Sequence, residues 1–364
     1  MKIKVPAGLF SRTGILLGLL LCFAVVSNIR LSKHFWTYSI ISDGRGYYAY
    51  LPALFLYNDL NFGFYDKVDA EFTDSHNRAD YRVTVNGHTA NKYFCGTALL
   101  QTPFFLAAKL YGSFSNDYSG YSKSYVAFMH IGALCWLGFG LMCLRKFLLR
   151  YNATPVMATL VCLLILFGTN LFYYAVAEPM MSHVYSFALI AAFLLQANKW
   201  MQEGKPLQFT SLAVLLALII LVRPVNGLIV LWLFIEAGSI SAFIARIRET
   251  VKKPLHVIAS VLLFAGILSI QALIWKEQTG SYFIDAYGDE GFRFDSFHFF
   301  DFLFSYRKGL FVYVPLTLLA LVGLIPFYRQ HKMRAMFTGV FLVVVIYILS
   351  SWWMCIMAEV LVHG

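Results

Sequence analysis

The chain has 364 residues, of which 59% are hydrophobic and only 13% are charged. A soluble domain carries about 25% charged residues, so this composition excludes an ordinary water-facing surface. The net charge of +10 does not indicate nucleic acid, because the lysines and arginines stand in short clusters beside apolar segments, as topology signals do. The six cysteines have neither the spacing of a zinc site nor that of a disulfide framework. These properties predict an integral membrane protein.

The first apolar segment follows a basic start and runs from Gly14 to about Val26. It resembles a signal peptide, but no small-residue cleavage site follows, so we expect an uncleaved first helix. Arg223-Pro224 interrupts the long apolar stretch 209–244, and we expect two helices that meet there at a membrane surface. The other runs long enough to cross about 30 Å of hydrocarbon are 14–30, 124–144, 155–176, 182–198, 255–275, 308–328 and 335–353.

Two shorter aromatic segments, 47–57 and 96–111, could also be spans. The later basic clusters decide against this, because they share the cytoplasmic side with the N-terminus only if 31–123 stays outside as one unit. We therefore expect both segments to be interfacial or re-entrant helices. The basic clusters in question are 145–150, 199–205, 246–253 and 329–334.

This arrangement predicts an all-α polytopic membrane protein, formed as one transmembrane domain with about nine spans. The N-terminus is expected in the cytoplasm. The large first external loop is 31–123, and a second, acid-rich external loop is 276–307.

The first external loop begins with Asp43, just after the first span and before an aromatic helix that includes Tyr47. A carboxylate at the membrane surface can act as a general base or hold a divalent cation. The alternative is that Asp43 only caps the following helix.

Lys92 and Tyr93 stand before the 96–111 helix. A lysine at a helix N-terminus faces the positive end of the helix dipole, so a shared anion such as phosphate is favoured there. The alternative is a lysine that extends to lipid headgroups.

Three further positions are expected on the same external face. Glu178, followed by His183, lies in the short turn between two spans. Glu178 could take part in the chemistry of this face, or it could be an ordinary acid of a loop. Arg223 ends its short helix there and could instead bind lipid phosphate. Arg307 opens the 308–328 helix against the positive-inside trend and is a weaker anion-binding candidate.

Asp43, Lys92, Glu178 and Arg223 are therefore expected to converge on one membrane face from distant parts of the chain. Cations can hold a phosphate leaving group while an acid activates an acceptor hydroxyl. This combination favours group transfer from a lipid-phosphate donor.

At these residues the chain resembles the GT-C superfamily of membrane glycosyltransferases, and within it the bacterial relatives of protein O-mannosyltransferases and lipid A aminoarabinose transferases. The shared features span nearly the whole chain: an acidic motif right after helix one, interfacial helices in the first external loop, a Lys-Tyr near its end, an acidic second external turn, and an Arg-Pro-Asn at a broken helix.

The resemblance implies inverting transfer of a sugar from a polyprenyl-phosphate carrier to a lipid, glycan or protein, on the periplasmic face of a bacterial inner membrane. It implies that Asp43 and Glu178 are the catalytic acids and that Lys92 contacts the donor phosphate, with Arg223 and Arg307 as further phosphate-binding candidates. Tyr47, Tyr93 and His183 are expected to support them. Metal dependence varies across the superfamily, so a divalent cation stays open and no other cofactor is expected.

The chain departs from the family pattern at two places. Many members have two adjacent acids in the first motif, whereas Gly44 follows Asp43 here. Relatives also continue past the paired Trp352-Trp353 with a Gly-Gly-Ser-Phe-Gly-x-Arg-like segment. One codon choice for 357–364 encodes such a segment in a shifted frame, so we expect a truncated or frameshifted reading frame.

Two other functions stay open. A transporter or flippase of lipid-linked glycans would carry ionisable residues inside its helices and paired broken helices, and only Glu236 and one break suggest this. The second is an inactive, truncated homologue that serves as a membrane scaffold.

Overall fold

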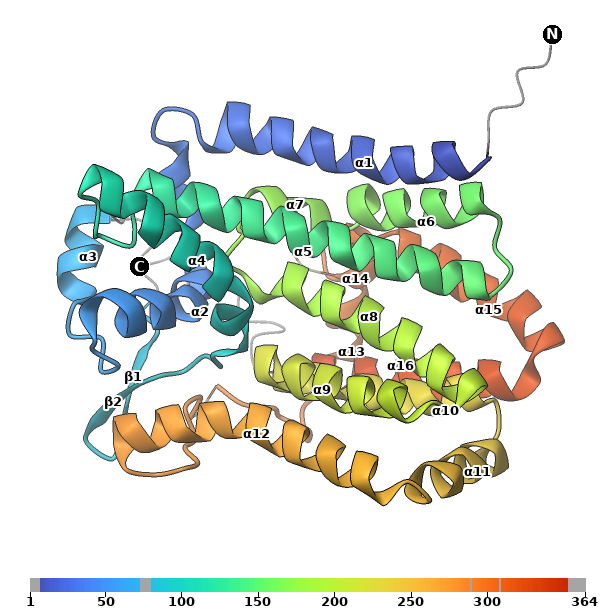
Figure 1. Ribbon diagram of the computed structural model, residues 1–364. Coiled ribbons are helices and arrows are strands. Elements are labelled where there is room, and N and C mark those ends of the chain that lie inside the picture. Colours follow the sequence, from blue (N-terminus) through green and yellow to red (C-terminus); the bar gives the residue numbers. More distant parts are fainter. Residues whose placement is uncertain (1–6, 73–79, 289, 308, 353–364) are drawn as a thin grey trace, which may run out of the picture. The chain divides into compact units, whose positions relative to one another are not determined.

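The computed structural model describes residues 7–72, 80–288, 290–307 and 309–352, apart from the side chains of 7–11 and 69. The described part is almost entirely helical and contains one small two-stranded sheet (Figure 1). The chain divides into two compact units, and each is described by itself. The first comprises Met1–Leu195, Ser211–Gly227 and Ala259–Ala286, and the second comprises Gln196–Thr210, Leu228–Ile258 and Tyr287–Gly364.

In the first unit, α1 packs against α5 and α6, and α5 packs against α4. Three helices of the chain, α8, α9 and α12, contribute to both units. The elements up to α12 that lie in the first unit are α1 (Ala7–Val25, continued by a π-helical turn Val26–Arg30), a 3-10 turn (Phe35–Ser39), α2 (Ser42–Pro52, continued by a π-helical turn Ala53–Tyr57), α3 (Tyr65–Phe72), β1 (Arg82–Val85), β2 (His88–Asn91), α4 (Gly96–Ser115), α5 (Lys123–Arg150), α6 (Pro155–Gly168), α7 (Leu171–Val176), α8 (Ser182–Glu203), α9 (Pro206–Val222) and α12 (Pro254–Thr279).

Within the part of the chain that the structure describes, four helical stretches are long and apolar enough to cross a membrane: Arg12–Arg30, Lys123–Arg150, Pro254–Thr279 and Lys332–Ser350. A fifth is added if the bent pair Pro224–Ala237 and Ile240–Val251 counts as one span. The chain is thus a mostly helical protein with several helices suited to a membrane. The expected number of nine spans stays a prediction, because α6, α9 and α15 are apolar but shorter.

Two segments that were expected to be single helices are broken. The 155–176 segment divides into α6 and α7, because Thr169 is extended (φ −130°, ψ 176°) and Asn170 starts a new helix. The 308–328 segment divides at Val314-Pro315, since a residue before proline avoids the helical region. The expected break at Arg223-Pro224 is confirmed, because α9 ends at Val222 and a 3-10 helix follows.

The first external loop of the prediction is a folded region. Helices cover both aromatic segments, as expected, and α4 is longer than predicted. The β1–β2 hairpin was not expected. Asn86 and Gly87 form its two-residue turn with φ of 53° and 82°, and positive φ at both positions is what a type I′ hairpin turn requires.

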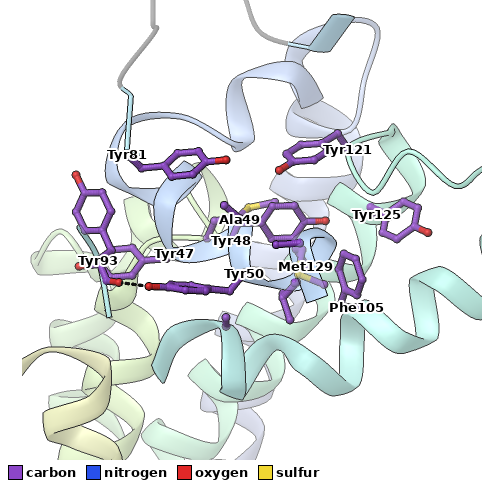
Figure 2. Packing of buried hydrophobic residues seen from close by; sticks show 14 of the residues in the cluster. Tyr47, Tyr48, Ala49, Tyr50, Tyr81, Tyr93, Phe105, Tyr121, Tyr125 and Met129 are labelled. Atoms are coloured by element: carbon purple, nitrogen blue, oxygen red, sulfur yellow. Dashed lines mark hydrogen bonds between the residues drawn. The ribbon is translucent and has the colours of Figure 1, made fainter. Parts of the chain in front are cut away.

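This region is held together by aromatic rings. Tyr48 of α2 packs against Phe105 of α4 and against Tyr121, and Phe105 also contacts Tyr125 of α5 (Figure 2). At the other end of the cluster, Tyr47 packs against Tyr93. Tyr48 is fully buried and its hydroxyl donates to the Gly120 carbonyl oxygen. Tyrosine suits this core because its ring fills apolar volume while its hydroxyl satisfies a backbone carbonyl.

In the second unit, α10 packs against α16, and Phe234 of α10 contacts Phe243 of α11 and Phe337 of α16. The described residues of the 287–298 segment run beside the end of α16, where the Arg293 amide donates to the Ser351 carbonyl oxygen at 2.7 Å. The expected departure from the family pattern at 353–364 lies outside the described residues. The elements that begin in the second unit are α10 (Trp232–Ala237), α11 (Ile240–Val251), α13 (Phe299–Phe304), α14 (Leu310–Tyr313), α15 (Leu316–Gln330) and α16 (Lys332–Ser350).

Candidate functional site

The carboxylate of Asp43 lies in the first turn of α2, where its Oδ1 accepts a hydrogen bond of 2.7 Å from the Tyr93 hydroxyl. Asp43 is not the cap of this helix, because the N-cap position is Ile41 and no side chain caps it. The capping alternative therefore does not hold. The Asp43 carboxylate is half-buried and accepts one hydrogen bond from a phenol. A carboxylate has two oxygens, so it can accept further hydrogen bonds from another donor.

Three hydrogen bonds hold Tyr93 in place against α2. The Asn91 side chain donates to the Gly46 carbonyl oxygen at 2.8 Å, and its own Oδ1 accepts from the Tyr93 amide at 3.0 Å. The Tyr50 hydroxyl donates to the Tyr93 carbonyl oxygen at 2.6 Å, as Figure 2 shows. The hairpin thus delivers Asn91 to a fixed point on α2, and Tyr93 follows two residues later.

The Tyr93 ring lies almost directly on the backbone of α2. A Cβ atom at Gly46 would stand only 2.1 Å from the Tyr93 ring, so only glycine fits there. The Tyr47 ring packs beside Tyr93 with 4.9 Å between the ring centroids. Gly46 therefore sets the distance at which Tyr93 reaches Asp43.

Two cations belong to the same unit as Asp43. The Lys92 Nζ atom lies 5.5 Å from the centre of the Tyr93 ring, whose hydroxyl binds Asp43. Arg223 follows the last residue of α9 and is exposed, and its guanidinium acts electrostatically on Tyr47. No acid among the described residues is recorded as an ion-pair partner of Arg223, which leaves its charge open to an anion.

A close contact joins the start of α4, which follows Lys92 in the chain, to the end of α9, which precedes Arg223. A Cβ atom at Gly96 would lie 2.3 Å from the Leu221 carbonyl carbon, so the start of α4 touches the end of α9 backbone to backbone. Lys92 stands just before Gly96, and Arg223 stands just after Val222. The two cations thus flank a contact that glycine makes possible.

Glu178 is buried and already has partners. It is only 8% exposed, and its Oε1 accepts a hydrogen bond of 2.6 Å from the Tyr173 hydroxyl. Arg30 donates to the neighbouring Ala177 carbonyl oxygen at 2.9 Å, and its guanidinium attracts the Glu178 carboxylate. A carboxylate in this setting orients the turn that contains it and has little surface for a substrate.

The turn that contains Glu178 packs against the start of α2. A Cβ atom at Gly44 would lie 3.3 Å from the Cβ of Met180. A carboxylate side chain at position 44 would extend further into Met180. The packing therefore leaves little room for a second acid at position 44.

Tyr47 and His183 border the same turn. Burial raises the pKa of the Tyr47 phenol, and the positive charge of Arg223 lowers it by less, so Tyr47 is a neutral donor at physiological pH. The Tyr47 hydroxyl lies beside that of Ser182 without the alignment of a full hydrogen bond. The His183 ring stacks on Tyr174 at 3.7 Å between centroids, which favours a packing role for the imidazole.

Arg307, a further predicted phosphate-binding residue, is described with its own unit. It belongs to the second unit, is exposed, and its backbone amide donates to the Ser305 hydroxyl. Within the described ranges, no group of three or more histidines, cysteines, aspartates and glutamates could hold a metal ion.

Sequence reasoning missed Arg30, Asn91 and the hairpin. The Asn86-Gly87 pair was a usable signal, because this dipeptide favours a type I′ turn between two strands. Arg30 gave no local signal, since its partner Ala177 is 147 residues away. No family model, curated protein or solved structure matches the chain.

Proposed function

We propose that this protein is a GT-C-like membrane glycosyltransferase that transfers a sugar from a polyprenyl-phosphate donor to an acceptor hydroxyl, with inversion at the anomeric carbon. The observation that carries the proposal is the Asp43 carboxylate, fixed by the Tyr93 hydroxyl at 2.7 Å, in the same unit as Lys92 and Arg223. A positioned base beside cations suits a reaction in which a hydroxyl loses a proton while a phosphate leaves.

In the proposed reaction, the acceptor oxygen attacks the anomeric carbon as its proton passes to the Asp43 carboxylate. The bond between that carbon and the phosphate oxygen breaks, and the electron pair leaves with polyprenyl phosphate. Lys92 and Arg223 would stabilise the charge that develops on the leaving phosphate, as cationic clamps do in other transfer reactions. The products are the glycosylated acceptor, polyprenyl phosphate and one proton.

The supporting residues take separate roles in this proposal. Tyr93 orients Asp43, and the neutral phenol of Tyr47 can donate to the sugar or its phosphate. Glu178 was predicted as a second catalytic acid, and its burial and bond to Tyr173 favour a positioning role instead. Arg307 stays a prediction.

The sidedness of the reaction rests on the basic clusters of the sequence. They favour an external site for 31–123, and hence the periplasmic face if the membrane is a bacterial inner membrane. The donor would be held by its phosphate and by membrane lipid around its polyprenyl chain. The acceptor, whether lipid, glycan or protein, needs only a hydroxyl.

The proposal is tested by sugar transfer from a polyprenyl-phosphate sugar, with purified protein in lipid. Asp43→Asn should lower the rate by roughly a hundredfold or more, because a positioned base supplies about that much. Asp66→Asn is the matched control, since this acid is 82% exposed in the same unit. Equal rates for Asp43→Asn and the parent would refute the assignment.

A parent protein that transfers no sugar, with a matched donor and acceptor, would favour the transporter interpretation or an inactive homologue. The same liposomes then allow a direct measurement of lipid-linked glycan movement between leaflets. Movement without transfer would replace the proposed function.

A further inference from the structure

Helix α11 (Ile240–Val251) differs from the apolar helices around it, because cations and apolar residues share its exposed surface. Its 12 residues reach about 18 Å at 1.5 Å each, too little for roughly 30 Å of hydrocarbon. It also turns by 107° from the preceding helical segment, Pro224–Ala237. If that segment crosses the membrane, α11 lies nearly parallel to the membrane surface (Figure 1).

The bend between α10 and α11 is built into the local sequence. Gly238 has φ of +73°, which L side chains rarely adopt, and the Ser239 hydroxyl caps α11 by accepting from the Ala242 amide at 3.1 Å. A glycine in the left-handed region followed by a capping serine ends one helix and starts another. Gly238 and Ser239 therefore end α10 and start α11 in a new direction.

One face of α11 is anchored to its own unit. Phe243 packs on Phe234 with 4.6 Å between ring centroids, and the Trp200 indole donates to the Thr250 hydroxyl at 3.2 Å. Arg246 reaches the Met201 carbonyl oxygen at 2.7 Å. These contacts fix which side of α11 faces outward.

The outward side is an apolar stripe. Ile240, Ile244 and Val251 repeat at helical spacing and are 58%, 43% and 54% exposed. Leu255, near the start of the following helix α12, is also an exposed apolar residue, at 79%. Apolar side chains at this spacing and exposure gain free energy by leaving water.

Cations border the stripe along one edge. Arg248 and Lys252 are exposed, one helical turn apart, and lie next to the stripe on the helix wheel. Lys253 is also exposed but lies outside α11, directly after the C-cap residue Lys252. An apolar face bordered by lysine and arginine is typical of a helix that lies in the interface of an anionic membrane.

We propose that α11 is an in-plane membrane helix whose apolar stripe enters the acyl-chain boundary, and whose Arg248 binds the phosphates of anionic phospholipids. Lys252 adds positive charge at the same edge, although its Nζ atom also pairs with the Glu249 Oε1 atom at 2.6 Å. The exposed cations complement that charge, and each surface lysine or arginine strengthens attraction to such lipids. Pro224–Ala237 then enters the membrane, and Ile240–Val251 lies along its surface. This inference does not depend on the proposed sugar transfer.

The depth of the helix is tested with spin labels on the full chain, in vesicles of phosphatidylcholine and phosphatidylglycerol in equal parts. Labels at Ile244→Cys and Val251→Cys should collide with oxygen more than with a water-soluble nickel chelate, and a label at Glu249→Cys should show the reverse. Equal access of nickel to all three sites would overturn the proposal. Shielding of Ile244 from both reagents, with spin–spin broadening, would also overturn it, because a second copy of the chain would then cover the stripe.

The lipid chemistry is tested by the phosphatidylglycerol that the purified protein retains in competition with phosphatidylcholine. Arg248→Gln should lower this retention about fivefold, whereas Lys253→Gln, the matched loss of one charge off the stripe, should lower it less. Both residues are exposed, so both variants should fold. Unchanged retention in Arg248→Gln, or an equal loss in Lys253→Gln, would refute the predicted phosphate contact.

Discussion

Gly46→Ala tests the packing that fixes Asp43 without assuming any activity. The added Cβ would stand 2.1 Å from one Tyr93 ring carbon and 2.8 Å from the Tyr81 Cβ. Ordinary contact begins at 3.4 Å, so the Tyr93 ring must retreat by 3.4 − 2.1 = 1.3 Å. A shift of that size along the bond would stretch the Tyr93–Asp43 hydrogen bond from 2.7 Å beyond its useful range.

The energetic cost has two opposing parts. Overpacking a well-filled core costs about 1–3 kcal/mol, and a lost hydrogen bond adds about 1 kcal/mol. Alanine in place of a helical glycine returns about 1 kcal/mol. We expect a net loss of about 1–3 kcal/mol in the free energy of unfolding, and a lower rate of sugar transfer if the proposed function holds.

The assay is thermal unfolding in detergent or nanodiscs, followed by intrinsic fluorescence. Gly266→Ala is the matched control, because Gly266 lies in α12 and a Cβ there meets nothing within 4 Å. Gly266→Ala should be neutral or slightly stabilising. A Gly46→Ala protein as stable as Gly266→Ala would show that Tyr93 does not pack on α2 as described.

Three other predictions follow from buried or close contacts. Gly96→Ala should destabilise the protein by about 1–3 kcal/mol in the same melting assay, because its Cβ would strike the Leu221 backbone; stability equal to the parent would contradict the contact. Burial raises the pKa of Asp117 but three serine hydroxyls lower it by more, so its folded pKa lies below the ordinary value. The ionised Asp117 carboxylate therefore stabilises the fold fully above its ordinary pKa, and this contribution is lost as the pH falls through the lower pKa of the folded state. In Asp117→Asn, the free energy of unfolding should depend less on pH in the acid range. Arg30→Gln and Glu178→Gln should each destabilise, and a double-mutant cycle should give a coupling of about 0.5–3 kcal/mol; additive losses would mean that the two charges do not interact.

The local features of the site could be predicted from the sequence. Asp43 follows the first span, an aromatic helix comes next, and α9 ends where arginine and proline interrupt its apolar run. Each of these depends on neighbouring residues only. Pro315 also ends the preceding helix, because a residue before proline avoids the helical region. The apolar composition of 308–328 had favoured one continuous helix there.

The contacts that assemble the site could not be predicted in the same way. Tyr93 and Asp43 are 50 residues apart, and a hairpin that was not expected brings them together. Arg30 supports the Glu178 turn from the end of the first span. Such pairings depend on how elements pack in three dimensions, and no local spacing contains that information.

The close approaches at two glycines leave Asp43 as the one acid at the start of α2. Gly44 faces Met180, so a second carboxylate there would disrupt the contact with the Glu178 turn. Because Gly46 has no side chain, the Tyr93 ring can lie against α2. Its hydroxyl then donates a hydrogen bond to Asp43. A phenol donates a hydrogen bond to the carboxylate, whereas a second carboxylate has no donor to offer and would repel it. The Tyr93 hydroxyl therefore holds the Asp43 carboxylate in one orientation, which the proposed role as a base requires.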